Sequence, residues 1–127
     1  MKLVTDTDTP PTSMQFRVDP FDFTVTIPAH PLKHHGERVE GLVDEQGRSI
    51  HICRSVPPEQ RLHVLAHELR HLWQWFYGTP HDAEGDANAV ATFTCSLIHQ
   101  LNRQGGEAAL IAMQPVQTAG RKAVARG

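Results

Sequence analysis

The residues best suited to chemistry form one short pattern, His67-Glu68-Leu69-Arg70-His71. In a helix, two histidines four residues apart project from the same face and lie about 6 Å apart along the axis. Both imidazoles can then bind one tetrahedral zinc ion at roughly 2.0 to 2.1 Å. Glu68 would stand beside a water on that ion and act as its base. The pattern therefore predicts a Zn2+ site with hydrolytic chemistry.

The residues around this pattern predict the helix that the chemistry needs. Ser55-Val56-Pro57-Pro58-Glu59 is a typical helix start, and Gly78 is a typical terminator. At 100° per residue, the apolar stripe between them centres about 170 to 180° from the midpoint of the two histidines. Trp75 lies nearer the histidine face and is expected to form a wall of the cleft. The stripe comprises Leu62, Leu65, Ala66, Leu69, Leu72, Trp73 and Phe76.

A second helix is predicted directly afterwards. Thr79 would be its N-cap, Pro80 would occupy its first position, and Gly105-Gly106 would end it. Because the connection is so short, the two helices should fold back on each other. Its predicted apolar stripe comprises Ala87, Val90, Ala91, Thr94, Leu97, Ile98 and Leu101.

A catalytic zinc site with one open position needs a third protein ligand. His63 lies about 12 Å from His71 along the helix axis, too far for one ion to bind both. A residue five to eight positions into the returning helix would lie level with His71, which favours Glu84 or Asp86. These two are about 200° apart around the helix, so periodicity alone does not choose between them.

The motif and the run Glu84-Gly85-Asp86-Ala87-Asn88-Ala89-Val90-Ala91 together resemble the gluzincin arrangement, H-E-x-x-H followed by E-x-x-A-(N/D)-x-x-A. The chain is most similar to the small ImmA/IrrE-type metallopeptidases, in which a strand precedes the helix as Ile50-His51-Ile52 does here. The resemblance implies that Glu84 is the third zinc ligand and that Asn88 orients a ligating histidine.

Other features of the sequence keep the third ligand open. Arg70 and Val90 depart from the family, which has a small and a bulky residue there. Gly78-Thr79-Pro80-His81-Asp82 is also similar to the G-T-x-D of aspzincins. That similarity keeps Asp82 and His81 as alternatives beside Glu84.

The resemblance implies hydrolysis of peptide bonds, with Glu68 as the general base. The candidates for stabilising the oxyanion are Tyr77, His63 or one of His30, His34 and His35. An extended substrate could pair with a sheet edge, for which Ser49–Arg54 is the candidate. The expected partner is a protein or peptide substrate, and the resemblance implies a separate repressor-type regulator. The alternative function is a non-catalytic binding module stabilised by zinc.

The elements before the helices predict a small sheet. Residues 21–27 alternate between apolar and polar types, which indicates a strand with one buried face. Residues 39–43 and 49–54, separated by a turn with Gly47, indicate a hairpin. The predicted fold is α+β, with a small antiparallel or mixed sheet followed by an active-site helix and a second, antiparallel helix. This arrangement would be a minimal zincin-like domain.

Length and composition limit the organisation of the chain. With 127 residues there is room for one domain, which we place at 16–106 between a flexible lead-in, 1–15, and a short helix with a basic tail, 107–127. Lys and Arg number 12 against 14 Asp and Glu, so charge gives no reason to expect nucleic acid as a partner. The sequence has no apolar run of membrane-spanning length and no signal-peptide core, so we expect a cytoplasmic protein without a membrane partner.

Overall fold

A computed structural model describes residues 10–116 and confirms the predicted α+β class. It contains a four-stranded sheet, a separate two-stranded hairpin and three α-helices that follow the strands. The strands of the sheet are β1 (Ser13–Val18), β2 (Phe21–Thr26), β5 (Gly41–Asp44) and β6 (Ser49–Ile52), and those of the hairpin are β3 (Lys33–His34) and β4 (Glu37–Arg38). The helices are η1 (Pro58–Gln60, a 3-10 turn), α2 (Arg61–Tyr77), α3 (Ala83–Asn102) and α4 (Gly106–Ala112).

The sheet is mixed, in the order β1-β2-β6-β5. The predicted strand at 21–27 and the predicted hairpin of β5 and β6 are both confirmed, and β6 also pairs with β2 in parallel. The expectation that Ser49–Arg54 forms an edge is therefore wrong. Ile50 and Ile52 are fully buried, and neighbours on both sides shield such a strand. Of the four strands, β5 and β1 form the edges.

The first strand was not predicted. Residues 1–15 were expected to be a flexible lead-in, but β1 begins at Ser13. Its alternate side chains Met14, Phe16 and Val18 are buried, which pays the entropic cost of ordering this segment. Residues 1–9 lie outside the described part of the chain. At the other end, α4 confirms the short helix, whereas 117–127 of the predicted tail also lie outside it.

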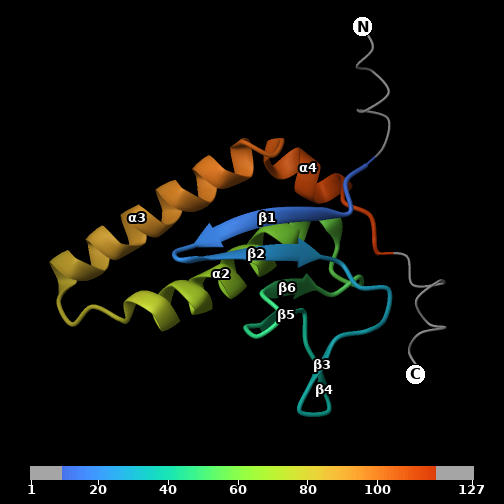
Figure 1. The fold of residues 1–127 in the computed structure, drawn as a ribbon, viewed down its shortest axis with the longest axis horizontal. Coiled ribbons are helices and arrows are strands. Elements are labelled where there is room, and N and C mark those ends of the chain that lie inside the picture. The colour runs from blue at the N-terminus through green and yellow to red at the C-terminus, as the bar shows by residue number, and fades with distance from the viewer. Residues whose placement is uncertain (1–9, 117–127) are drawn as a thin grey trace, which may run out of the picture.

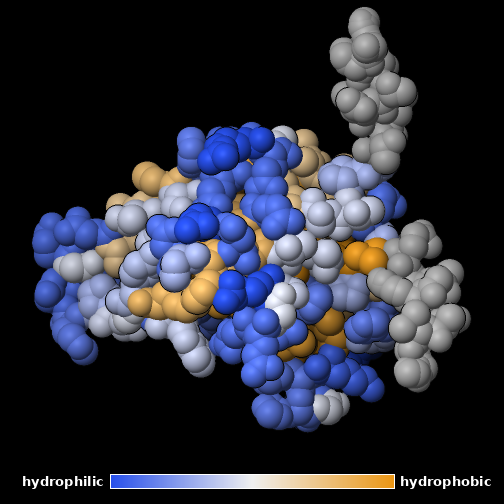
Figure 2. Space-filling view, in the orientation of Figure 1, coloured by the Kyte–Doolittle hydropathy of each residue, from blue (hydrophilic) through white to orange (hydrophobic). Residues whose placement is uncertain are grey.

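The molecule has two main layers. Figure 1 shows the sheet lying across α2, while α3 runs alongside β1 and leads into α4. The core lies between the sheet and α2, and it includes Phe16, Phe23, Val25, Ile50, Leu65, Leu69 and Leu72. The other face of the sheet carries polar residues such as Gln15, Thr24 and His51, and the surface seen from that side is largely hydrophilic (Figure 2). None of the helices in the described part of the chain is both long and apolar enough to cross a membrane.

Helix α2 is fixed at both ends. Its last residue is followed by Gly78, which adopts a positive φ of 79° that favours glycine, as the predicted terminator should. At its first residue, Arg61 is buried, and its Nη1 donates to the carbonyl oxygens of Leu110, Ile111 and Met113 at 2.8 to 3.0 Å. This contact ties the start of α2 to the end of α4.

Helix α3 begins later than predicted. Its N-cap is Asp82 and not Thr79, because the Asp82 carboxylate accepts a hydrogen bond from the Gly85 backbone N–H at 2.5 Å. Thr79 and Pro80 therefore belong to the connection between the two helices.

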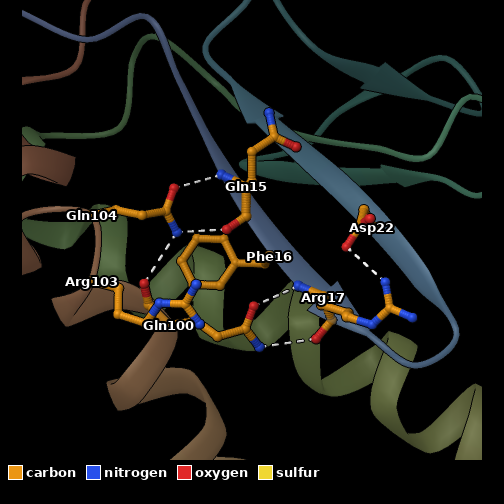
Figure 3. Close-up of a pocket in the computed structure, with 7 residues that line it drawn as sticks. All are labelled: Gln15, Phe16, Arg17, Asp22, Gln100, Arg103 and Gln104. Carbon is orange, nitrogen blue, oxygen red and sulfur yellow. Dashed lines mark hydrogen bonds and ion pairs between the residues drawn. The ribbon is translucent and has the colours of Figure 1, made fainter.

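Helix α3 is also rotated relative to the prediction. Gln104 receives the backbone N–H of Gln15 and donates to its carbonyl, and Gln100 does the same with Arg17 of β1 (Figure 3). These four hydrogen bonds cover the edge of β1 and set the face that α3 buries. As a result Val90 and Ile98 of the predicted buried stripe are exposed, as are Ala87, Ala91 and Thr94, whereas Leu101 is buried as expected.

Candidate active site

The two histidines of the motif project from the exposed side of α2 and point toward each other. Their Nε2 atoms are 3.0 Å apart, and their rings meet edge to face. Two nitrogens bound to one tetrahedral ion at 2.0 to 2.1 Å would lie about 3.3 Å apart. His67 and His71 are thus close to the separation that a shared zinc ion requires. The expected orientation of this helix face, away from the core stripe, is confirmed.

Glu68 lies between the histidine pair and the sheet. Its side chain is half-buried against β5, where a Cβ added to Gly41 would lie 2.9 Å from Glu68 Oε2. Burial raises the pKa of the Glu68 carboxyl above its usual value, and the positive charge of His67 and His71 opposes this effect. The carboxylate is therefore held at the contact between the helix and the edge strand.

Two cavities open on either side of the Glu68–Gly41 contact. The first, of about 380 Å³, is lined by Val39, Glu40, Gly41, His63, Val64, His67 and Glu68. The second, of about 580 Å³, extends along β5 past His71 and is lined by His34, Val39, Gly41, Leu42, Val43, Glu45, Glu68, His71, Gln74 and Trp75. Because Glu68 borders both, the two cavities form one cleft that passes over the motif.

The candidates for oxyanion stabilisation lie in different places. His63 lines the first cavity beside His67, and His34 of β3 lines the second beside His71. Tyr77 lines neither cavity; its ring stacks on Trp73, and its hydroxyl lies 3.5 Å from the carbonyl oxygen of Asp19 in the β1–β2 turn. His30 and His35 also line neither cavity.

The candidates for the third ligand lie at the start of α3. Glu84, Asp86 and Asn88 are all exposed there, as are His81 and Asp82 before them. Among residues 10–116, no three His, Cys, Asp or Glu side chains come together closely enough to hold a metal ion. The structure thus assembles the two histidines beside Glu68 and leaves the acids of α3 apart from them.

Sequence reasoning missed the part played by the segment 39–43. It was predicted only as one strand of a hairpin, yet Val39 and Gly41 border both cavities and Leu42 and Val43 line the second. The signal was Gly41 itself, since a glycine within a strand often marks close approach of another group. Here that group is Glu68.

Comparison with known families identifies the chain's relatives. A family described as "Putative metallopeptidase family (DUF6782)" matches residues 28–118, more than half of the chain. The chain belongs to this metallopeptidase family. No curated protein and no solved structure matches it significantly. Membership supports a metal-dependent peptidase, and the matched region contains β5, α2 and α3, including the whole cleft.

Proposed function

We propose that this chain is a zinc-dependent endopeptidase of the gluzincin type, similar to the small ImmA/IrrE-type enzymes. The observation that carries the proposal is the convergence of His67 and His71, with Nε2 atoms 3.0 Å apart, next to a half-buried Glu68 at the floor of a cleft. A carboxylate at that place has no ion pair to satisfy within the described residues. General-base chemistry gives it a role.

In this proposal each residue of the motif has one task. His67 and His71 hold the zinc through their Nε2 atoms. When bound, zinc supplies Lewis acidity, which lowers the pKa of water and polarises a carbonyl group. Glu68 accepts the proton of the attacking water and then donates a proton to the leaving amine nitrogen. The cleft on both sides of Glu68 gives an extended chain room to pass over it.

Glu84 is proposed as the third ligand, with Asn88 orienting one of the histidines and Asp86 as the alternative. The support is the sequence pattern, since an acid and an amide one turn apart suit a ligand and its hydrogen-bond partner. Because these side chains are exposed and apart from the histidines, the first turns of α3 must move for Glu84 to reach them.

The proposed substrate is an extended segment of a protein or peptide lying along β5. This strand pairs on one side with β6, and its residues line the cleft on the other. Pairing with a strand edge reads the backbone of a substrate more than its side chains. A separate repressor-type regulator is the proposed protein substrate, on the basis of the similarity to ImmA/IrrE-type enzymes.

The test is proteolysis of an unfolded casein by the zinc-loaded chain and by Glu68→Gln. We expect cleavage by the unaltered chain, its loss on chelation and recovery with zinc, and at least about a 100-fold lower rate in Glu68→Gln. Equal zinc content in both proteins is the control. Zinc in both and cleavage in neither, with repressor-type proteins also intact, would instead identify a zinc-stabilised binding module.

A further inference from the structure

Trp75 is the most exposed large apolar side chain of those the structure describes. It is 70% accessible, although it lies only one turn after His71 on the same helix. Trp73, two residues earlier, packs against Phe93 and Tyr77. Within residues 10–116, Trp75 has no comparable ring partner. An exposed tryptophan without a packing partner is costly in water and is typical of a binding surface.

The position of Trp75 connects it to the cleft. Together with Val39, Leu42 and Val43, it gives the larger cavity an apolar lining at the edge strand. The same cavity reaches Glu68 and His71, so a group that binds against Trp75 is continuous with the proposed reaction centre. The cavity of about 580 Å³ has room for one large side chain and part of the chain that carries it.

The charges of this cavity select against one class of side chain. Its lining contains the carboxylates Glu45 and Glu68, and no lysine or arginine among the residues that the structure describes. An acidic side chain would therefore meet like charge at both ends of the cavity. The smaller cavity differs, since Glu40 and two histidines line it with only two valines.

We propose that the Trp75 cavity is the side-chain pocket that determines specificity, and that it takes a large apolar side chain of an extended peptide, aromatic or long aliphatic. This inference rests on the proposed function, because it assigns the substrate class of the same cleft. Trp75 and Leu42 supply the contact surface, and β5 supplies the backbone edge. The other exposed large apolar side chains, such as Ile98 on α3, border neither cavity of the cleft.

The test measures binding separately from cleavage. Fluorescein-labelled decapeptides of glycine and serine carry one central residue, either phenylalanine, serine, aspartate or lysine. Their dissociation constants are measured by fluorescence polarisation with the zinc-loaded full chain carrying Glu68→Gln, which keeps the peptides intact. We expect the phenylalanine peptide to bind about 10-fold tighter than the serine peptide and the aspartate peptide to bind weakest.

Variants at position 75 assign this preference to the pocket. Trp75→Ala should reduce the preference for phenylalanine to less than about threefold, whereas Trp75→Phe should keep most of it. Ile98→Ala, which removes an equally exposed apolar side chain on α3, should leave it unchanged. A preference that survives Trp75→Ala, or that favours the lysine peptide, would overturn the proposal.

Cleavage separates this inference from the proposed function. The unaltered zinc-loaded chain is incubated with a mixture of random peptides, and the products are sequenced by mass spectrometry. Cuts beside large apolar residues, lost in Trp75→Ala, support both. Cuts without that preference overturn the pocket and leave the peptidase. Preferential binding of the phenylalanine peptide with no cutting overturns the peptidase and leaves the pocket.

Discussion

Gly41 of the edge strand lies directly against the carboxylate of Glu68. A Cβ at position 41 would stand 2.9 Å from Glu68 Oε2 and 2.7 Å from Val64 Cγ1, closer than such atoms approach in proteins. Glycine therefore allows β5 and α2 to come together at the point where the two cavities of the cleft meet. The position of the proposed base depends on the absence of a side chain across from it.

Replacing Gly41 should displace Glu68. We expect Gly41→Val to lower the free energy of unfolding by about 1 to 3 kcal/mol through overpacking and to lower kcat/KM for peptide cleavage by about tenfold or more through the moved carboxylate. Urea unfolding and a peptide assay measure the two effects. Ala91→Val adds bulk at an exposed position of α3 and is the control. Full activity in Gly41→Val would show that this contact does not position the base.

Arg61 should be important for stability, because it is the buried link between α2 and α4. We expect Arg61→Met to cost about 2 to 4 kcal/mol of unfolding free energy, since three carbonyl oxygens lose their charged donor. Arg54→Met is a matched control, because that arginine makes one exposed bond to the carbonyl of Ala29. If both variants unfold at the same urea concentration, the contacts of Arg61 contribute nothing beyond those of a surface arginine.

The glutamines of α3 should protect the edge of β1. We expect the double variant Gln100→Ala and Gln104→Ala to lose about 1 to 3 kcal/mol of unfolding free energy and to self-associate, because an uncovered strand edge pairs with other chains. Urea unfolding and light scattering report these changes, with Thr92→Ala on the exposed side of α3 as control. An unchanged double variant would mean that apolar contacts alone hold α3 in place.

Helix α2 and its histidines could be predicted closely because one strong periodic signal determines them. Leu65, Leu69 and Leu72 are buried as the stripe requires, and the same period places His67 and His71 on the opposite, exposed side. The hairpin of β5 and β6 was equally predictable, since a turn with Gly47 separates two apolar runs.

The remaining parts depend on contacts that hydropathy does not encode. The orientation of α3 follows from backbone hydrogen bonds made by Gln100 and Gln104, which a search for apolar residues treats as surface. The calculation that brought Glu84 level with His71 assumed that α3 returns along α2. In the structure α3 instead leans on β1 and meets α2 where Phe93 contacts Trp73.

The most direct test of the account is the zinc content of the purified, dialysed chain, measured by mass spectrometry of the metal. We predict one zinc ion per chain for the unaltered protein and for Glu68→Gln, and less than about one tenth of that for His67→Asn and for His71→Asn, because each variant removes one of two converging nitrogens. Folded variants, verified by circular dichroism, that keep a full zinc complement would contradict the assignment of the metal centre to this pair.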